Sequence, residues 1–283
     1  MRSVVVGTSV TISATKFRPY SITNGLYLGQ KGLFIATEYS LLFLVDNVTA
    51  LVDGSNATIY TVIGPYPAIT DVDGPFSSLS TSTYHVSRMS YESSTNVLYI
   101  MTSNALRIAN LTSNNLWTAS TPHNFQSTVQ FPLFDVKAVG ATLYVSDTVR
   151  VYNLTRIPNS EKYSYTSQTY STLYEYMSYQ GWFISSKSFV YITGIEVIVT
   201  KGLLCVSVSY SRNVILAIPI DASSYTSVTV LAGDPNAPLP AGVNAIVYSS
   251  RDGLVDGNRS SEALLAYPAD LAYDLATDSL YFT

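Results

Sequence analysis

A four-residue motif, Leu143-Tyr144-Val145-Ser146, decides the fold expected for this chain. It reads apolar, aromatic, apolar and then small, and related stretches lie at residues 33–36, 98–101, 204–207 and 280–283. A second apolar run follows the first four copies after a few polar or turn residues, at residues 41–45, 106–111, 149–154 and 214–220. Two apolar runs separated by a short turn predict a β-hairpin.

Each motif copy belongs to a longer repeat. A further strand is expected to begin 11 to 14 residues upstream of each copy, near Pro19, His85, Pro132, Thr193 and Pro268. A glycine-terminated strand closes the unit at residues 61–64 and 230–233, and residues 4–7 resemble it. Gly7 and Gly64 are 57 residues apart, so the unit holds four strands in about 57 residues. Repeated four-stranded antiparallel units predict an all-β protein, a β-propeller with about five blades in view.

The composition agrees with an all-β fold. Hydrophobic residues make up 47% of the 283 residues, charged residues only 12%, and there are 23 tyrosines. Disordered chains need the opposite balance, and tyrosine suits a half-buried pleated surface. The net charge of −4 argues against a nucleic-acid partner. No apolar run reaches the ~18 residues of a membrane span, so none is expected within this chain.

One unit of the repeat resembles the NHL-repeat propellers. The resemblance rests on residues 228–233, Asp256-Gly257, residues 262–272 and residues 280–283, with a weaker second match at residues 61–111. It implies a six-bladed propeller. We therefore expect residues 1–283 to form a single NHL-like domain that is incomplete at one or both ends. In the alternative, the strand at residues 3–7 joins residues 268–283 in a closing blade of three strands.

The cellular setting is expected to be secretory. Five N-glycosylation sequons predict a secreted, cell-surface or lumenal glycoprotein, and their acceptors are Asn47, Asn56, Asn110, Asn153 and Asn258. Cys205 is the only cysteine and lies in an apolar run, which predicts a buried, unreactive side chain.

Three ionisable residues recur at one position of the first strand. Arg88, Asp135 and Glu196 each lie three residues after the start of that strand in successive blades. Because the first strand of a blade is innermost, we predict that they line one level of the central channel, with Arg88 near Asp135. Two interpretations stay open, a plug whose charges neutralise one another and a polar ligand or metal site at the channel mouth.

An aromatic-rich stretch supplies the second candidate site. It contains the surface candidates Tyr163, Tyr165, Tyr174, Tyr176 and Trp182. The alternation at 163/165 and at 174/176 predicts strands with one aromatic face, and no stretch of the chain suggests a helix. Such a face suits contact with a protein or a glycan, and the alternative is an outer strand with a covering loop.

The sequence favours a binding scaffold over an enzyme. Zinc-ligand spacing, a nucleophile elbow and a phosphate-binding loop are all missing, so we expect no catalytic residue, metal or cofactor. The predicted function is a non-catalytic propeller that binds a protein or glycan partner. The alternative, implied by the resemblance, is a metal-dependent lactonase- or lyase-like enzyme with ligands such as Asp135 and Glu196 at the channel mouth.

Overall fold

The computed structural model contains two compact units, Met1–Ser120 and Thr121–Thr283. Each unit is described by itself. The structure describes residues 19–37, 40–45, 59–64, 72–76, 86–102, 105–118, 134–147, 150–156, 163–166, 171–180, 190–210, 213–222, 224–234, 265 and 267–283.

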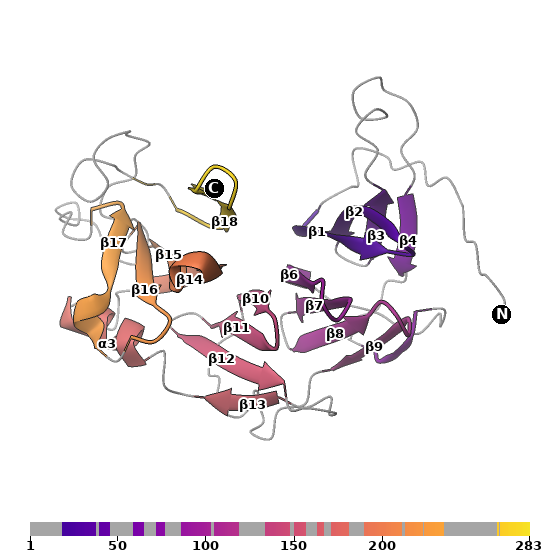
Figure 1. The fold of residues 1–283 in the computed structure, drawn as a ribbon, viewed down its shortest axis with the longest axis horizontal. Coiled ribbons are helices and arrows are strands. Elements are labelled where there is room, and N and C mark those ends of the chain that lie inside the picture. The colour runs from indigo at the N-terminus through magenta and orange to yellow at the C-terminus, as the bar shows by residue number, and fades with distance from the viewer. Residues whose placement is uncertain are drawn as a thin grey trace. The chain divides into compact units, whose positions relative to one another are not determined.

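The first unit holds two antiparallel sheets (Figure 1). One sheet has four strands in chain order, β1 (Ser21–Tyr27), β2 (Gln30–Ala36), β3 (Leu41–Val45) and β4 (Ile59–Ile63). The other runs β5-β9-β8-β7-β6, with β5 (Gly74–Pro75), β6 (Val86–Glu92), β7 (Val97–Thr102), β8 (Leu106–Asn110) and β9 (Asn115–Thr118).

An aromatic cluster holds the first unit together. The rings of Phe34 and Phe43 lie 4.8 Å apart, and the ring of Tyr91 from β6 lies 6.1 Å from that of Phe34. Gly25 makes this contact possible, because a β-carbon there would lie 2.5 Å from the Phe34 ring. Apolar residues along β2 and β3 therefore contribute to a packed interior between the two sheets.

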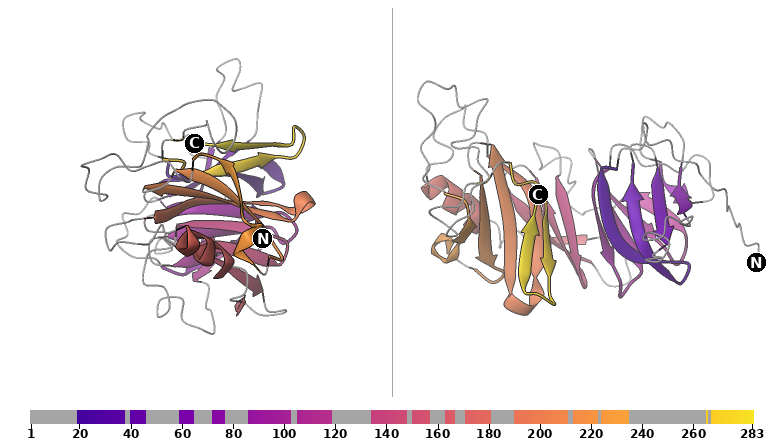
Figure 2. Two further views of the ribbon diagram at one scale, coloured as in Figure 1. Left: turned by 90° about the vertical axis from the view of Figure 1, so that its left-hand side faces the viewer. Right: turned by 90° about the horizontal axis from the view of Figure 1, so that it is seen from above.

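The second unit holds two four-stranded antiparallel sheets and one hairpin. The first sheet contains β10 (Asp135–Val139), β11 (Thr142–Ser146), β12 (Val151–Arg156) and β13 (Tyr163–Thr166). The next contains β14 (Val190–Ile198), β15 (Leu203–Tyr210), β16 (Val214–Pro219) and β17 (Thr229–Ala232). The hairpin consists of β18 (Leu271–Asp274) and β19 (Ser279–Phe282). Figure 2 shows the β14–β17 sheet between the β10–β13 sheet and the hairpin.

These sheets confirm the predicted fold class of four-stranded antiparallel β units. Every motif copy lies on the second strand of its sheet, β2, β7, β11, β15 or β19. The glycine-terminated strands are the outer strands β4 and β17, and both glycines have the positive φ that favours this residue, 95° at Gly64 and 88° at Gly233. Cys205 is fully buried on β15, as predicted.

The helix α3 (Ser171–Tyr179) corrects one prediction. A strand was expected around Tyr174 and Tyr176, but Leu173, Tyr176 and Met177 are buried at the i, i+3 and i+4 spacing of a helix. Tyr176 is 8% exposed and packs in the core beside the β14–β17 sheet, so it lies beneath the surface rather than on it. The backbone of Tyr163 and Tyr165 forms β13, whereas Trp182 lies outside the described residues.

Candidate functional site

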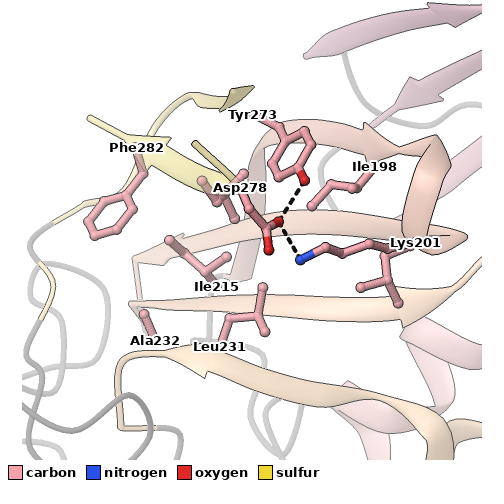
Figure 3. A pocket seen from close by; sticks show the side chains of 10 residues that line it. Ile198, Lys201, Ile215, Leu231, Ala232, Tyr273, Asp278 and Phe282 are labelled. Atoms are coloured by element: carbon pink, nitrogen blue, oxygen red, sulfur yellow. Dashed lines mark hydrogen bonds and ion pairs between the residues drawn. The ribbon is translucent and has the colours of Figure 1, made fainter. Parts of the chain in front are cut away.

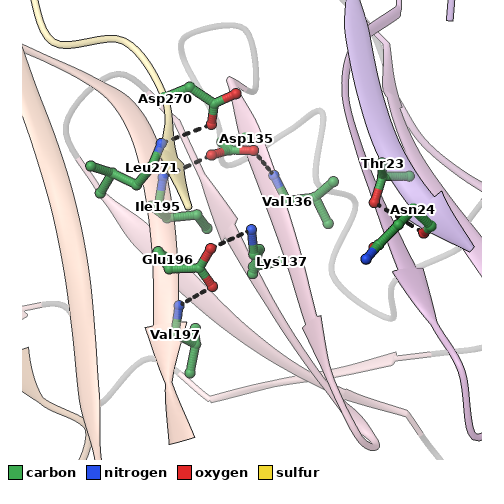
Figure 4. Close-up of polar contacts among 10 residues, drawn as sticks. All are labelled: Thr23, Asn24, Asp135, Val136, Lys137, Ile195, Glu196, Val197, Asp270 and Leu271. Atoms are coloured by element: carbon green, nitrogen blue, oxygen red, sulfur yellow. Dashed lines mark hydrogen bonds and ion pairs between the residues drawn. The ribbon is translucent and has the colours of Figure 1, made fainter. Parts of the chain in front are cut away.

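A row of buried polar groups follows the first strands β10 and β14. Asp135 is 4% exposed, and its carboxylate accepts hydrogen bonds from the backbone N–H of Val136 (2.8 Å) and of Ile195 (2.7 Å). The second bond joins neighbouring sheets (Figure 4). A bulge between Ile192 and Gly194 interrupts the β14–β15 pairing just before Ile195. The Asp135 carboxylate is thus anchored by two backbone donors.

The second carboxylate of the row, Glu196, lies in an ion pair. Its Oε2 lies 2.7 Å from Nζ of Lys137, and its Oε1 accepts a hydrogen bond from the Val197 N–H at 3.0 Å (Figure 4). Glu196 is 8% exposed, so the ion pair compensates a charge that burial would otherwise disfavour. Sequence reasoning did not single out Lys137, although its alternation with apolar neighbours on β10 was a usable signal.

The strand register corrects the predicted single level. Asp135 pairs with Ser146, the last residue of its motif copy. The equivalent residue of the next copy is Ser207. Glu196 pairs instead with Cys205, two residues earlier. The residue at the level of Asp135 is Gly194, and Glu196 shares its level with Lys137. The cause is the hairpin tip, which has two residues between β10 and β11 but four between β14 and β15. Counting along the chain from the start of each first strand did not account for this difference of two residues.

Arg88 belongs to the first unit and pairs with Met101 on β7. Its Nη1 donates a hydrogen bond to the carbonyl of Ser87 at 3.0 Å. The proximity of Arg88 to Asp135, and the lining of a channel by all three residues, remain predictions. Within the second unit, backbone donors and the Lys137 ammonium already engage both carboxylates. The two interpretations of Arg88, Asp135 and Glu196, a self-neutralising plug and a ligand or metal site, both stay predictions.

A pocket of ≈ 310 Å³ opens between the β14–β17 sheet and the β18–β19 hairpin (Figure 3). Its walls combine polar groups of Lys201, Tyr273 and Asp278 with the apolar side chains of Ile198, Leu203, Ile215, Leu231, Ala232, Leu280 and Phe282. Phe282 is 44% exposed, which is unusual for a phenylalanine on a strand facing a neighbouring sheet. The pocket therefore offers a hydrophobic surface that the described residues leave accessible.

A polar cluster borders the same pocket. Asp278 lies 2.5 Å from Nζ of Lys201 and accepts a hydrogen bond from the Tyr273 hydroxyl at 2.6 Å (Figure 3). The hydrogen bond from Lys201, followed by that from Tyr273, lowers the pKa of Asp278. The hydrogen bond to Asp278 raises the pKa of Tyr273. A pocket that combines apolar walls with a charged border can bind an amphipathic ligand and orient it.

Sequence reasoning missed this pocket. Residues 280–283 were recognised as a strand motif, but no ligand site was predicted there. Lys201 and Asp278 lie in two different hairpin tips, 77 residues apart in the sequence, and only the stacking of the hairpin on the β14–β17 sheet brings them together. No local pattern carries that information.

Two of the five sequons fall within the described residues. Asn110 ends β8, and its side-chain oxygen accepts hydrogen bonds from the backbone N–H groups of Thr112 and Ser113 in the following turn. Asn153 lies within β12 and is paired with Tyr144 on one side and Thr166 on the other. Asn47, Asn56 and Asn258 lie outside the described residues. A turn suits glycosylation better than a paired strand, so Asn110 is the stronger candidate.

The described part of the chain contains no group of three or more His, Cys, Asp or Glu residues arranged to hold a metal ion. Both histidines, His85 and His123, lie outside it. Among the described helices, none has the length and apolar character needed to cross a membrane.

Comparisons with known proteins bear on the fold. No family model and no curated protein matches the chain. Among solved structures, an auxiliary nutrient binding protein from Bacteroides ovatus has a TM-score of 0.54 at 10% identity, over 94% of this chain and 56% of that protein. The extracellular domain of a putative one component system from B. thetaiotaomicron has a TM-score of 0.50 at 11% identity, over 97% of this chain and 33% of that one.

A chain of a nidogen/laminin complex gives a TM-score of 0.50 at 9% identity, over 94% of this chain and 71% of that one. This chain spans about a third to just over half of the first two proteins. At such identities the likeness concerns the fold alone. The fold is β-propeller-like, built from four-stranded antiparallel sheets.

Proposed function

We propose that this chain is a non-catalytic, NHL-like propeller scaffold that binds a protein or glycan partner at the pocket beside the β18–β19 hairpin. The observation that carries the proposal is the combination of exposed Phe282, an apolar wall and the Lys201–Asp278 border in one pocket. The nutrient-binding protein and the nidogen/laminin complex are similar folds whose names refer to binding. They support a binding role without specifying the partner.

A binding screen with one matched pair of variants tests this proposal. The immobilised full chain is exposed to a glycan array and to a peptide library, and each ligand found is then measured against Leu231→Asp and Thr229→Asp. Both positions lie on β17, but Leu231 lines the pocket, whereas Thr229 is exposed and is not one of the lining residues. We expect a charge at Leu231 to weaken binding at least tenfold, and the Thr229 variant to bind normally. An array and a library that both fail to yield a ligand would overturn the proposal.

The enzyme alternative requires a metal bound by carboxylates such as Asp135 and Glu196. Both already accept backbone hydrogen bonds, and Glu196 is also paired with Lys137, which favours the scaffold. Thermal melts with and without Ca²⁺ and Zn²⁺ separate the two. A metal at 100 times its Kd adds about 2.7 kcal/mol to the free energy of unfolding. A rise that disappears in Asp135→Asn would favour the enzyme.

We further propose a secreted, cell-surface or lumenal location for this scaffold. The support is the exposed turn that contains the Asn110 sequon. Expression in a secretory host and removal of N-glycans by a glycosidase test it. We expect a loss of mass that Asn110→Gln reduces and Asn153→Gln leaves unchanged.

A further inference from the structure

The apolar walls of the pocket continue a buried core cluster. Ile198 and Ile215 belong to this cluster, which β14, β15 and β16 share with Leu271 of the hairpin. Several partly buried residues pack against the cluster and also line the pocket, namely Leu203, Leu231, Ala232, Tyr273 and Leu280. An apolar group placed on these residues would remove their remaining surface from water, which favours binding.

The polar border of the pocket contains a carboxylate with one unengaged oxygen. Nζ of Lys201 at 2.5 Å and the Tyr273 hydroxyl at 2.6 Å both contact Oδ1 of Asp278. Among the described residues, no hydrogen bond or ion pair reaches its Oδ2. Figure 3 shows this second oxygen on the side of Ile215 and Leu231. Since both oxygens of a carboxylate can accept hydrogen bonds, Oδ2 offers an acceptor to a ligand in the pocket.

The charges at this border favour a cationic head group on the ligand. Lys201 and Asp278 are the charged residues that line the pocket, and they are paired with each other. An anionic head group would have to displace Asp278 from Lys201 or lie beside its carboxylate. A ligand ammonium would instead donate to Oδ2 while Lys201 stays on Oδ1, and hydrogen bonds between charged groups are the stronger ones.

The position of Lys201 leaves room for this second cation. Its Nζ lies 6.0 Å from the centre of the Tyr273 ring, so the ammonium is held between that ring and Oδ1 of Asp278. The hydrogen bonds from Lys201 and Tyr273 lower the pKa of Asp278 and keep its carboxylate ionised at neutral pH. The pocket therefore presents a charged acceptor directly beside an apolar wall.

We propose that this pocket binds an apolar group that carries an ammonium, with the ammonium on Oδ2 of Asp278 and the apolar part against Leu231 and Phe282. This inference rests on the proposed binding function and narrows its class of ligand. An apolar residue at the free N-terminus of a partner protein has this chemistry, and so does a small apolar amine, whereas a neutral glycan does not. Asp278 sets the preference for the head group, and the apolar walls supply most of the contact.

Three probes that share one apolar part test the head group. Phenethylamine, phenethyl alcohol and hydrocinnamate each carry a phenyl ring on a short alkyl chain, and they end in an ammonium, a hydroxyl and a carboxylate. In NMR titrations of the full chain, we expect the amine to bind about tenfold more tightly than the carboxylate, with the alcohol between them. An amine that does not bind, or a carboxylate that binds as tightly, would overturn the proposal.

Two variants of the ion pair separate recognition from a structural role. Asp278→Asn keeps an acceptor oxygen but removes the charge, so the amine should bind about tenfold more weakly and the alcohol should change little. Lys201→Met removes the cation that shares the carboxylate, so the amine should bind about threefold more tightly. If both variants weakened all three probes alike, the ion pair would be structural only, and the proposal would fail. Circular dichroism checks that each variant is folded.

The apolar contact is tested by a matched pair on β19. Phe282→Ala removes a side chain that lines the pocket, and it should weaken all three probes by a similar factor. Tyr281→Ala removes a neighbouring ring that is not among the lining residues, and it should leave their binding unchanged. Equal effects of the two changes would place the probes outside the pocket and overturn the proposal.

A short peptide distinguishes the two sources of the amine. Phe-Gly-Ser-Gly is measured with a free and with an acetylated N-terminus, and the free form should bind about tenfold more tightly. A free form that also exceeds phenethylamine supports a protein N-terminus, and one that falls below it supports a small amine. Equal binding of the two forms would overturn the proposal. Ligands from the screen that carry no ammonium but are weakened by Leu231→Asp would leave the binding function standing and refute ammonium recognition alone.

Discussion

The hairpins β10–β11 and β18–β19 contain almost the same motif with very different surroundings. Leu143-Tyr144-Val145-Ser146 and Leu280-Tyr281-Phe282-Thr283 lie on second strands with matching antiparallel pairing. Yet Tyr144 is 5% exposed and Tyr281 57%, while Val145 is fully buried and Phe282 is 44% exposed. The motif determines the hairpin. Burial depends on what surrounds the hairpin: among the described residues, β11 also pairs with a third strand, β12, whereas β19 pairs with β18 alone.

The largest expected effect compares the two motif tyrosines. Tyr144→Ala should reduce the free energy of unfolding by about 3–5 kcal/mol, because it empties space in a packed core. Tyr281→Ala should cost less than about 1 kcal/mol, because its ring is mostly in water. Urea denaturation followed by circular dichroism measures both. Similar losses would mean that Tyr281 is covered in solution, and the comparison would fail.

A smaller difference is expected at the aspartates that begin the two hairpins. Asp135→Ala should cost about 2–4 kcal/mol, because the Val136 and Ile195 N–H groups lose their buried acceptor. Asp270 accepts from Leu271 at 2.9 Å but is exposed, so Asp270→Ala should cost less than about 1 kcal/mol. Asp135→Asn, which retains one acceptor oxygen, should fall between them. Thermal melts of the three variants decide, and a harmless Asp135→Ala would contradict the anchoring role of this carboxylate.

The smallest effect concerns pH at the tip of the β18–β19 hairpin. Hydrogen bonds from Lys201 and Tyr273 lower the folded-state pKa of Asp278 below its unfolded value. Its stabilising contribution is therefore complete above the unfolded pKa, about 3.9, and is lost as the pH falls through the lower folded pKa. Unfolding midpoints between pH 2 and 7 should show a shallower acid-side loss in Asp278→Asn than in the parent chain. An NMR titration should place the Asp278 pKa higher in Lys201→Met, and an unmoved pKa would rule out the ion pair.

The hairpins could be predicted from sequence because a period of two and a short turn are local signals. Helix α3 could not be predicted in this way, because Tyr176 belongs to two patterns at once. It takes part in the tyrosine alternation at 174/176 and in the helical spacing of Leu173, Tyr176 and Met177. Tertiary packing on the β14–β17 core decided between them.

The candidate sites were predictable to a lesser extent. The pattern of ionisable residues found the buried carboxylates of Asp135 and Glu196, because charged residues in apolar strands are rare. It missed their partners, since Lys137 and the Ile195 N–H are recruited across two sheets. The pocket depends on contact between Lys201 and Asp278, which no spacing in the sequence encodes.

The hairpin tips have a consequence for how such a repeat can change in length. The first two strands of each sheet are joined by two residues in β1–β2 and β10–β11, and by four in β6–β7, β14–β15 and β18–β19. A tip can therefore gain or lose two residues without altering which side chains enter the interior. If the sequences of two sheets are aligned without allowing for such a two-residue difference, residues matched on the first strand lie about 7 Å apart along the strand, at about 3.4 Å per residue. For grafting a foreign loop, these tips are the natural points of entry.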